Sequence, residues 1–282
     1  ILKMPDKSYS DLDAYPELAY SKEIKVLSWN LWWKFENYLD RQKLIFNELL
    51  ILNPDILCLQ EVWEDSDGSQ AKKIADLFGY EYTYSKSFEI DGVSFGNAII
   101  SKFPILNSSS HKIPTATEFN ENRTLMHSVV NYDGFEIDIL CTHLNYKYDQ
   151  SNIRQNQVAF ILEYISKLKK PKFPTILCGD FNADPLSEEI MQITGLKSSI
   201  KGTVLRDAWQ ITNRDDPGYT WSNNNYYAKR SLEVDRRIDY IFVSKPTSKG
   251  LGHPIKSILV GASPKDNIFP SDHFGIMTYL EG

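Results

Sequence analysis

The sequence predicts a mixed α/β fold whose strands converge on one polar site. Apolar runs of strand length recur along the 282 residues, and segments with helical spacing lie between some of them. Six of these runs stop abruptly at residues that can hold a metal, move a proton or bind a phosphate: residues 26–30, 56–62, 139–145, 175–182, 236–243 and 270–273. One such ending is expected by chance. Six of them, spread over most of the chain, indicate that several strands deliver their ends to a single place.

The N-terminal part of the chain alternates predicted strands with predicted helices. Residues 24–29 alternate and indicate a first strand. Residues 38–52 carry apolar side chains near helical spacing, and Asn53-Pro54 ends that helix because the residue before a proline is disfavoured in the α region. A strand over residues 56–60 follows. Residues 70–78 then predict a second helix, which a glycine closes.

The middle of the chain predicts antiparallel pairs and one long helix. Strands are expected over residues 80–84, 97–100, 125–131 and 135–142, the last two joined by a hairpin turn. Residues 151–168 repeat apolar side chains at the spacing of an amphipathic helix. Direct hairpins imply antiparallel pairing, whereas strands joined through a helix require a crossover, so we expect a mixed sheet.

The last third of the chain is less regular. Residues 197–229 show no clear period, and we interpret them as loops around a short apolar segment at residues 204–209. Residues 247–264 lack a helical period. Residues 238–243 and 274–280 read as the strands that complete the sheet.

Composition bounds the class of protein. With 42% apolar and 13% aromatic residues, the chain can bury a sizeable core, and we expect one catalytic domain over residues 1–282, with a loosely ordered leader at residues 1–22. The net charge is -6 and the pI is near 5.5. An acidic chain argues against affinity that rests on covering a polyphosphate backbone with Lys and Arg, because such binding scales with the number of phosphates neutralised. A small or locally held phosphate ester fits better.

Cysteine usage and hydropathy give an expectation about location. No segment approaches the roughly 20 apolar residues that cross a bilayer. Cys58, Cys141 and Cys178 each lie in a separate apolar run, which indicates buried thiols and a reducing, cytoplasmic compartment. Because the chain starts with Ile1, an N-terminal segment removed by processing is left open. Cys and His are not clustered at ligand spacing, which argues against a zinc enzyme.

Glu61 is the candidate metal ligand. It follows an apolar run, so its carboxylate would emerge at a strand end, where a hard cation such as Mg²⁺ can be held by few protein ligands and several waters. Asn30, at the end of another predicted strand, can orient that carboxylate or touch the cation. In isolation, Glu61 also fits the first solvated residue after a strand.

Asp180 and Asn182 form the second candidate group. They are two residues apart on an extended segment, so their side chains point to the same side, and Gly179 before them permits a tight backbone path. An Asp there can take a proton from water, and an Asn can donate to a phosphoryl oxygen as negative charge builds. Gly-Asp-x-Asn is also an ordinary turn. The apolar run before it favours the catalytic interpretation.

The remaining candidates are histidines and their carboxylate partners. Asp272 and His273 are adjacent, so on an extended chain they face opposite sides and serve different partners. Asp239 lies in an otherwise apolar run and would be a costly buried charge unless paired, for instance with a histidine. His143 also falls at a strand end. A histidine supported by a carboxylate is suited to holding or protonating a phosphoryl oxygen.

Taken together and in this order, the motifs resemble the endonuclease/exonuclease/phosphatase superfamily. That group contains deoxyribonuclease I-like nucleases, exonuclease III-like repair enzymes, deadenylases, neutral sphingomyelinases and inositol phosphatases. The resemblance covers residues 24–280 and rests on Trp29-Asn30, Gln60-Glu61-Val62, Thr142-His143-Leu144, Gly179-Asp180-Phe181-Asn182, Arg237-Ile238-Asp239-Tyr240 and Ser271-Asp272-His273. It implies a four-layered α/β sandwich of two packed, largely antiparallel mixed sheets, Mg²⁺ or Mn²⁺ dependence, and hydrolysis of a phosphoester by in-line attack of water.

The resemblance also implies roles for individual residues. Glu61 would be the main metal ligand, helped by Asn30 and Asp272. Asp180 would orient or deprotonate the attacking water, and Asp239 would orient a histidine. The predicted contacts to the scissile phosphate and the rest of the substrate are Asn182, His143, His273, Asn145 and Arg123.

Two departures narrow the subfamily. Exonuclease III-like enzymes usually carry an acidic residue two positions after the first-strand Asn, and a Tyr in the Thr-His-Leu motif. This chain has Trp32 and His143 at those positions, which argues against an abasic-site nuclease. The motifs are more similar to the sphingomyelinase, deadenylase and tyrosyl-DNA phosphodiesterase branches.

The sequence therefore predicts a Mg²⁺-dependent phosphodiesterase, expected to act as a monomer. Two substrates compete: a nucleic acid single strand or end, and a phospholipid headgroup. Aromatic residues beside the strand ends could stack on bases or enter a lipid interface, and more often such residues are packing residues: Trp32, Trp33, Trp63, Tyr146, Tyr148, Trp221, Tyr226 and Tyr227. A non-catalytic scaffold of the same fold would predict at least one broken motif, and none is broken.

Overall fold

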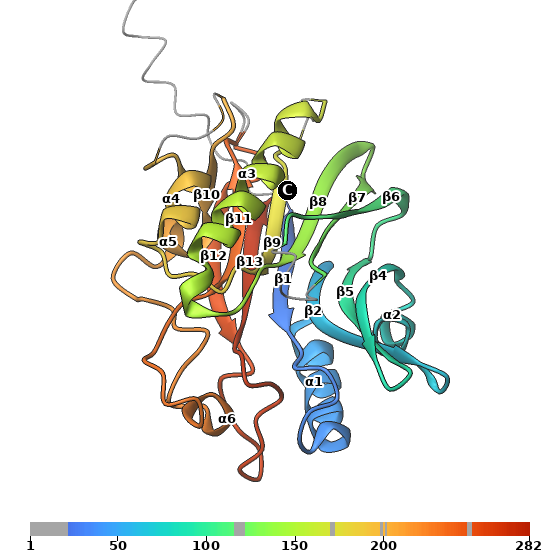
Figure 1. Ribbon diagram of the computed structural model, residues 1–282. Coiled ribbons are helices and arrows are strands. Elements are labelled where there is room, and N and C mark those ends of the chain that lie inside the picture. Colours follow the sequence, from blue (N-terminus) through green and yellow to red (C-terminus); the bar gives the residue numbers. More distant parts are fainter. Residues whose placement is uncertain (1–21, 116–121, 170–172, 198–199, 201, 247–249) are drawn as a thin grey trace, which may run out of the picture.

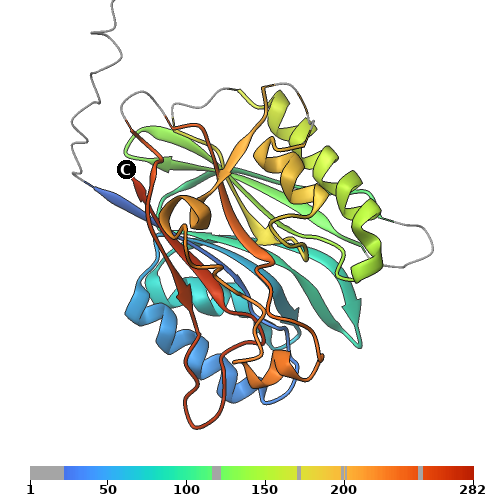
Figure 2. The same cartoon turned by 90° about the vertical axis from the view of Figure 1, so that its left-hand side faces the viewer.

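Two β-sheets pack face to face, and helices cover their outer faces (Figures 1 and 2). The computed structural model describes residues 22–115, 122–169, 173–197, 200, 202–246 and 250–282. Figure 2 shows α1 and α2 on one side of the paired sheets and α3 and α4 on the other. The expected four-layered α/β sandwich is confirmed.

The first sheet contains the N-terminal strands and the C-terminal strand. Its order is β12 (Pro254–Val260), β13 (Gly275–Glu281), β1 (Glu23–Asn30), β2 (Ile56–Asp65), β5 (Val93–Ser101) and β4 (Glu81–Ile90), and the short β3 (Gly68–Ser69) pairs with β2. β1 and β2 are parallel because α1 (Tyr38–Leu52) carries the chain from one to the other. The remaining pairs in this sheet are antiparallel.

The second sheet repeats this arrangement. Its order is β10 (Leu205–Asp207), β11 (Asp239–Ser244), β9 (Ile176–Asp180), β8 (Phe135–His143), β7 (Thr124–Tyr132) and β6 (Ile105–Lys112). β8 and β9 are parallel, and α3 (Ser151–Lys167) connects them across the outer face. The other pairs are antiparallel, so both sheets are mixed, as expected from the hairpins and crossovers.

Alternation along each strand builds three apolar layers. In β2, Ile56 and Cys58 point into the core between the sheets, whereas Leu57 and Leu59 face α1 and α2 (Gln70–Phe78). A third cluster joins the outer face of the second sheet to α3 and α4 (Glu188–Thr194). All three cysteines are free and buried in the central layer or its edges, as predicted.

The irregular segments hold elements that the sequence did not predict. Residues 197–229, interpreted as loops, contain β10 and two short helices, α5 (Ala208–Thr212) and α6 (Tyr226–Lys229). Polar side chains start both helices: Asp207 accepts from the backbone of α5, and Asn225 accepts from that of α6. β3, β6, β12 and α4 were also not predicted, because short or mostly polar elements give no clear period.

The structure bears on the N-terminal leader and on membrane-spanning helices as follows. Nearly all of the N-terminal leader lies outside the described residues. Within the described part of the chain, none of the helices combines the length and the apolar character that a membrane crossing requires.

Candidate active site

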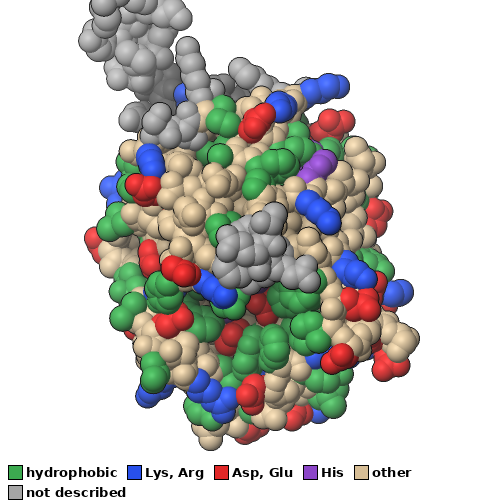
Figure 3. Space-filling view, viewed as in Figure 1, with side chains coloured by type: hydrophobic (Ala, Val, Ile, Leu, Met, Phe, Trp, Pro, Cys, Tyr) green, Lys and Arg blue, Asp and Glu red, His purple; other side chains and the backbone are tan. Residues whose placement is uncertain are grey.

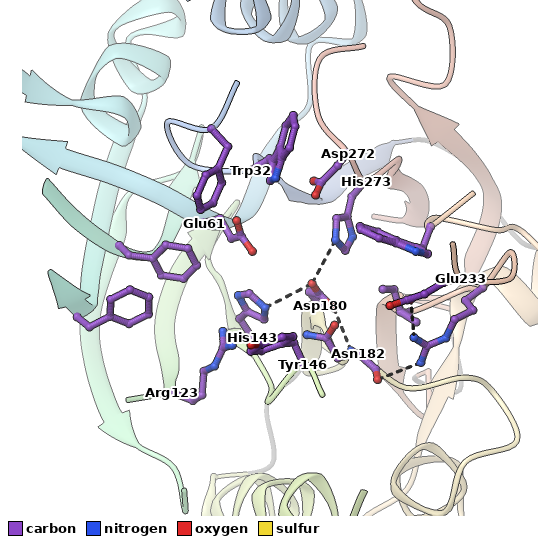
Figure 4. Close-up of a pocket in the computed structure, with 16 residues that line it drawn as sticks. Trp32, Glu61, Arg123, His143, Tyr146, Asp180, Asn182, Glu233, Asp272 and His273 are labelled. Atoms are coloured by element: carbon purple, nitrogen blue, oxygen red, sulfur yellow. Dashed lines mark hydrogen bonds and ion pairs between the residues drawn. The ribbon is translucent and has the colours of Figure 1, made fainter. Parts of the chain in front are cut away.

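Strand register brings the polar endings together. His143 of β8 and Asp239 of β11 are both register partners of Asp180 in β9, so the three side chains stand in one row. On the facing sheet, Asn30 ends β1 beside Gln60 of β2. The carboxyl ends of both parallel pairs therefore meet at the same edge of the sandwich, where a pocket of about 410 Å³ opens (Figure 4).

Asp180 occupies the centre of this pocket and is held from two sides. Its Oδ1 accepts a hydrogen bond from the backbone N–H of Asn182 at 2.9 Å. Its Oδ2 accepts one at 3.0 Å from Nδ2 of Asn30, which belongs to the other sheet. Gly179 is required just before it, because a Cβ at that position would lie 2.3 Å from the backbone oxygen of Thr142. Burial, followed by the charge of Asp239, raises the pKa of Asp180 to about 6.

Two histidines flank Asp180 and differ in charge. His143 Nε2 lies 3.4 Å from Asp180 Oδ2, and His273 Nε2 lies 3.7 Å from the same oxygen. Burial and the nearby charges of Arg123 and His273 lower the pKa of His143 well below its ordinary value, so it is neutral. Burial also disfavours charge on His273, but the carboxylates, Asp239 first, outweigh it and raise its pKa well above the ordinary value. One imidazole is thus neutral and the other is an imidazolium.

His273 is fixed in place by its partners. Its Nδ1 lies 2.9 Å from Oδ2 of the fully buried Asp239, which matches the prediction that Asp239 contacts a histidine. The Trp221 ring meets the imidazole edge-on at 5.0 Å between centroids. The loop that carries His273 is tied down by Ser271, whose hydroxyl donates to the backbone oxygen of Asn30 at 2.7 Å.

A β-bulge presents Glu61 to the pocket. The pairing of β2 with β5 shifts register between Leu59 and Val62, and Glu61 takes a left-handed backbone conformation (φ 53°) there. Such a conformation is unfavourable for a residue with a Cβ and is typical of functional sites. Burial, and then the charge of Asp272, raise the pKa of Glu61 to about 7. The pKa of Asp272 is raised too, chiefly by burial.

The donor set fits a divalent cation. Glu61 and Asp272 face the same space (Figure 4), and their raised pKa values show that both carboxylates would gain from a positive charge there. Asp180, Asp239 and His273 also offer ligand atoms within 4.8 Å of one another. Because His273 and Asp239 already form a hydrogen-bonded pair, Glu61 and Asp272 are the better match for a hard cation.

Asn30 supports the carboxylates through its amide nitrogen. Nδ2 donates to Glu61 Oε1 at 3.2 Å as well as to Asp180, while Oδ1 accepts the backbone N–H of Trp32 at 3.0 Å. The sequence left two roles open for Asn30: orienting the Glu61 carboxylate, or binding the cation itself. Because its side-chain oxygen bonds to the backbone, the structure fits the first role better.

The polar side of the pocket holds the predicted phosphate contacts. Asn182, with a left-handed backbone (φ 51°), and Arg123 both line the pocket. Arg236 also lines it and pairs with Asp184 at 3.0 Å. Its sequence neighbour Arg237 points the other way and pairs with a buried aspartate, as alternation along an extended segment requires.

Asn145, for which a substrate contact was predicted, does not line the pocket. Its Oδ1 accepts Nε2 of Gln157 at 2.7 Å and its Nδ2 donates to Gln150 at 3.1 Å, so the fully buried amide is occupied on both sides. These contacts join the loop after β8 to α3. Asn145 therefore holds that loop, and the substrate contact predicted for it stays a prediction.

Of the apolar wall of the pocket, the sequence singled out Trp32 but not the three phenylalanines. Trp32, Phe35, Phe88 and Phe95 line one side, and Phe88 and Phe95 stack at 4.5 Å. The two stacked phenylalanines come from the β4–β5 hairpin, whose strands carry no polar ending. Only their alternation as strand residues could have been read from the sequence.

The sequence analysis also missed Arg41, which holds in place two loops that border the pocket. It lies in α1, is buried, and its guanidinium donates to the backbone oxygens of Leu31, Trp32, Trp33, Phe35 and Pro270. One side chain thus ties the loop after β1 to the loop before Asp272. Burial lowers its pKa to about 10, so it remains charged.

The fold and the site define a protein of the Endonuclease/Exonuclease/phosphatase family. The model of that family matches residues 27–273, and the chain belongs to it, as the sequence motifs indicated. The chain is 27% identical to the inositol phosphosphingolipids phospholipase C of Schizosaccharomyces pombe, over 92% of this chain and 68% of that protein. It is 28% identical to human nocturnin, over 73% of this chain but only 49% of that protein.

Solved structures show the same fold. TDP2 of D. rerio, complexed with a single-strand DNA product, superposes with a TM-score of 0.75 at 23% identity and covers 93% of this chain and all of that one. The catalytic domain of human nocturnin superposes with a TM-score of 0.70 at 23% identity, over 91% of this chain and 92% of that chain. At this level of identity the likeness concerns the fold alone.

Proposed function

We propose that this chain is a divalent-metal-dependent phosphodiesterase. The observation that carries the proposal is the position of Asp180, between a neutral and a charged imidazole and opposite the Glu61–Asp272 pair. That arrangement offers a base, a proton donor and a cation site around one pocket.

Glu61 and Asp272 would hold Mg²⁺ or Mn²⁺, with Asn30 orienting Glu61. Bound there, such an ion would act as a Lewis acid on a phosphoryl oxygen. The chain's own residues account for the proton transfers. With a pKa near 6, Asp180 is mostly ionised at neutral pH, yet it is a stronger base than an ordinary aspartate, so it can take the proton of an attacking water.

Residues around Asp180 would stabilise the phosphate. In the proposed reaction the water oxygen bonds to phosphorus, the ester P–O bond breaks, and the leaving oxygen takes a proton from the His273 imidazolium. His143 and the amide of Asn182 line the space beside Asp180, and the guanidinium of Arg123 adds positive charge. Asp239 acts through His273, by keeping that imidazole charged and oriented.

The pocket suits an ester with one apolar arm. Its aromatic wall faces its polar side across a volume of about 410 Å³, which accommodates a headgroup or a terminal nucleotide rather than a duplex. Similar proteins are named for both substrate types: a phospholipase C for inositol phosphosphingolipids, and a tyrosyl-DNA phosphodiesterase. Either substrate would place a phosphodiester next to Asp180.

The test is hydrolysis of a soluble chromogenic phosphodiester by metal-stripped protein, with and without added Mg²⁺ or Mn²⁺. We expect turnover only with metal, and a loss of at least about 100-fold in kcat for Asp180→Asn. Asp76→Asn, the same change on the exposed surface of α2, is the matched control and should leave kcat unchanged. Metal-independent turnover, or an Asp180→Asn variant as active as the wild type, would contradict the proposal.

A further inference from the structure

Exposed apolar side chains border the mouth of the pocket. Figure 3 shows hydrophobic side chains around a hollow in which acidic side chains lie. We define the apolar rim as Phe35, Tyr146, Tyr148, Leu232 and Val234, all of which are exposed. They come from three separate loops, which follow β1, β8 and α6.

Contacts place the three loops at the same opening. Phe35 and Tyr146 line the pocket themselves. Glu233, which lies between Leu232 and Val234 in the chain, also lines it, and the Tyr148 hydroxyl donates to the Glu233 carboxylate at 3.2 Å. The rim is therefore continuous with the apolar wall inside the pocket.

Packing within the chain does not explain Leu232 and Val234. Their exposed fractions are 91% and 70%, so neither contributes to a core. Leu232 also has a left-handed backbone (φ 61°), which is unfavourable for any residue with a Cβ. Single exposed apolar residues are common, but a group of them around an active-site mouth indicates a binding surface.

The chemistry of the rim favours a lipid surface over a nucleic acid. Phe35, Tyr146 and Tyr148 have rings that could serve either partner, but Leu232 and Val234, the most exposed members of the rim, have no ring on which a base could stack. Two arginines near the mouth are paired with carboxylates: Arg236 with Asp184 at 3.0 Å, and Arg230 with Glu36 at 2.8 Å. Binding to a polyphosphate backbone depends on neutralising phosphates with available cations, and a chain with a net charge of -6 is poorly suited to it.

The same residues suit the boundary between headgroups and acyl chains. Aliphatic side chains enter that boundary, and tyrosines prefer it because their rings are apolar and their hydroxyls remain hydrated. The phosphodiester of a phospholipid lies at headgroup level. A pocket opening within the rim could therefore receive the headgroup while the acyl chains stay in the bilayer.

We propose that the apolar rim docks on a zwitterionic phospholipid surface and so presents a headgroup phosphodiester to the pocket. This inference rests on the proposed phosphodiesterase function and names its substrate class. Because docking depends on apolar side chains and not on net charge, it should be insensitive to salt.

The experiment measures sedimentation with phosphatidylcholine–sphingomyelin vesicles at low and high salt. The rim variant is Leu232→Ser/Val234→Ser. The matched control is Leu50→Ser/Ile51→Ser, which removes two exposed apolar side chains from α1 instead. We expect wild type and control to bind the vesicles equally at both salt concentrations, and the rim variant to bind about tenfold more weakly or worse.

Turnover of the soluble phosphodiester separates this inference from the function on which it rests. Leu232 and Val234 do not line the pocket, so the rim variant should hydrolyse the soluble substrate like wild type with Mg²⁺ and lose activity only on vesicles. Equal vesicle binding by wild type and rim variant would overturn the inference, as would no binding by wild type, or binding that high salt abolishes. If vesicle binding follows the expectation but no protein turns over the soluble substrate, the proposed function fails and the docking surface stands.

Discussion

Replacing Glu61 by Gln should make the metal-free protein more stable at neutral and alkaline pH. Gln keeps an oxygen for the hydrogen bond from Asn30 but removes the charge that burial and Asp272 disfavour. The pKa of Glu61 is raised from 4.5 to about 7 in the folded protein. A raised carboxyl pKa means that the folded state binds the proton more tightly than the unfolded state does. Stability is therefore lost as pH rises from about 4.5 through about 7.

The magnitude follows from the same pKa. A rise from 4.5 to about 7 corresponds to about 3.4 kcal/mol, at 1.36 kcal/mol for each tenfold change in proton affinity. Glu61 keeps some contact with solvent, so we expect roughly half of this, about 1.5 kcal/mol. For a chain of 282 residues that free energy raises the melting temperature of the variant by about 2–3 °C at pH 8. At pH 4 the two proteins should melt together.

The assay is calorimetric or fluorescence-detected melting across this pH range, in chelator and then in Mg²⁺. At a concentration of Mg²⁺ about 100 times its Kd, wild type should gain about 2.7 kcal/mol, whereas Glu61→Gln should gain much less. A Glu61→Gln variant no more stable than wild type in chelator at pH 8 would contradict the raised pKa of Glu61, and equal stabilisation of both proteins by Mg²⁺ would contradict its role as a metal ligand.

Other substitutions test the remaining parts of the site. Arg41→Met should lower the free energy of unfolding in urea by at least about 3 kcal/mol, because several buried carbonyl oxygens lose their donor. Arg41→Lys should lower it by less, and equal stability of all three proteins would contradict this. Asp239→Asn should lower the pKa of His273, so the alkaline limb of the plot of kcat against pH should move to lower pH with little change in KM. An unshifted limb would show that Asp239 does not keep His273 charged. Gly179→Ala should destabilise the fold by about 2–3 kcal/mol or prevent folding, because the new Cβ would lie 2.3 Å from the backbone oxygen of Thr142; a denaturation midpoint equal to that of wild type would show that the strands separate easily.

Local patterns predicted the main helices, the mixed strand pairing and the gathering of polar strand ends, whereas the four layers and the residue roles came from the family resemblance. The helices over residues 38–52 and 70–78 have clear periods, and their limits are confirmed. Asp180, His143 and Asp239 each end or begin an apolar run, and strand pairing then places them side by side.

Other features depend on contacts between distant residues, which no local pattern records. Arg41 lies on a helix among ordinary polar residues, and only the folded chain places it against backbone oxygens at Leu31 and Pro270. Asn145 stands in a sequence position typical of a substrate contact, but Gln150 and Gln157 occupy its amide. Short elements such as α5 and α6 contain too few residues to show a period.

Hydrolysis of a soluble phosphodiester in ¹⁸O-labelled water, by protein stripped of metal and then given Mg²⁺, tests the proposed metal-dependent attack of water. We predict turnover only after Mg²⁺ is restored, with one solvent oxygen in the phosphomonoester product, because Asp180 would direct water at phosphorus. Equal turnover without metal, no turnover with Mg²⁺ or Mn²⁺, or a phosphomonoester free of solvent oxygen would contradict it.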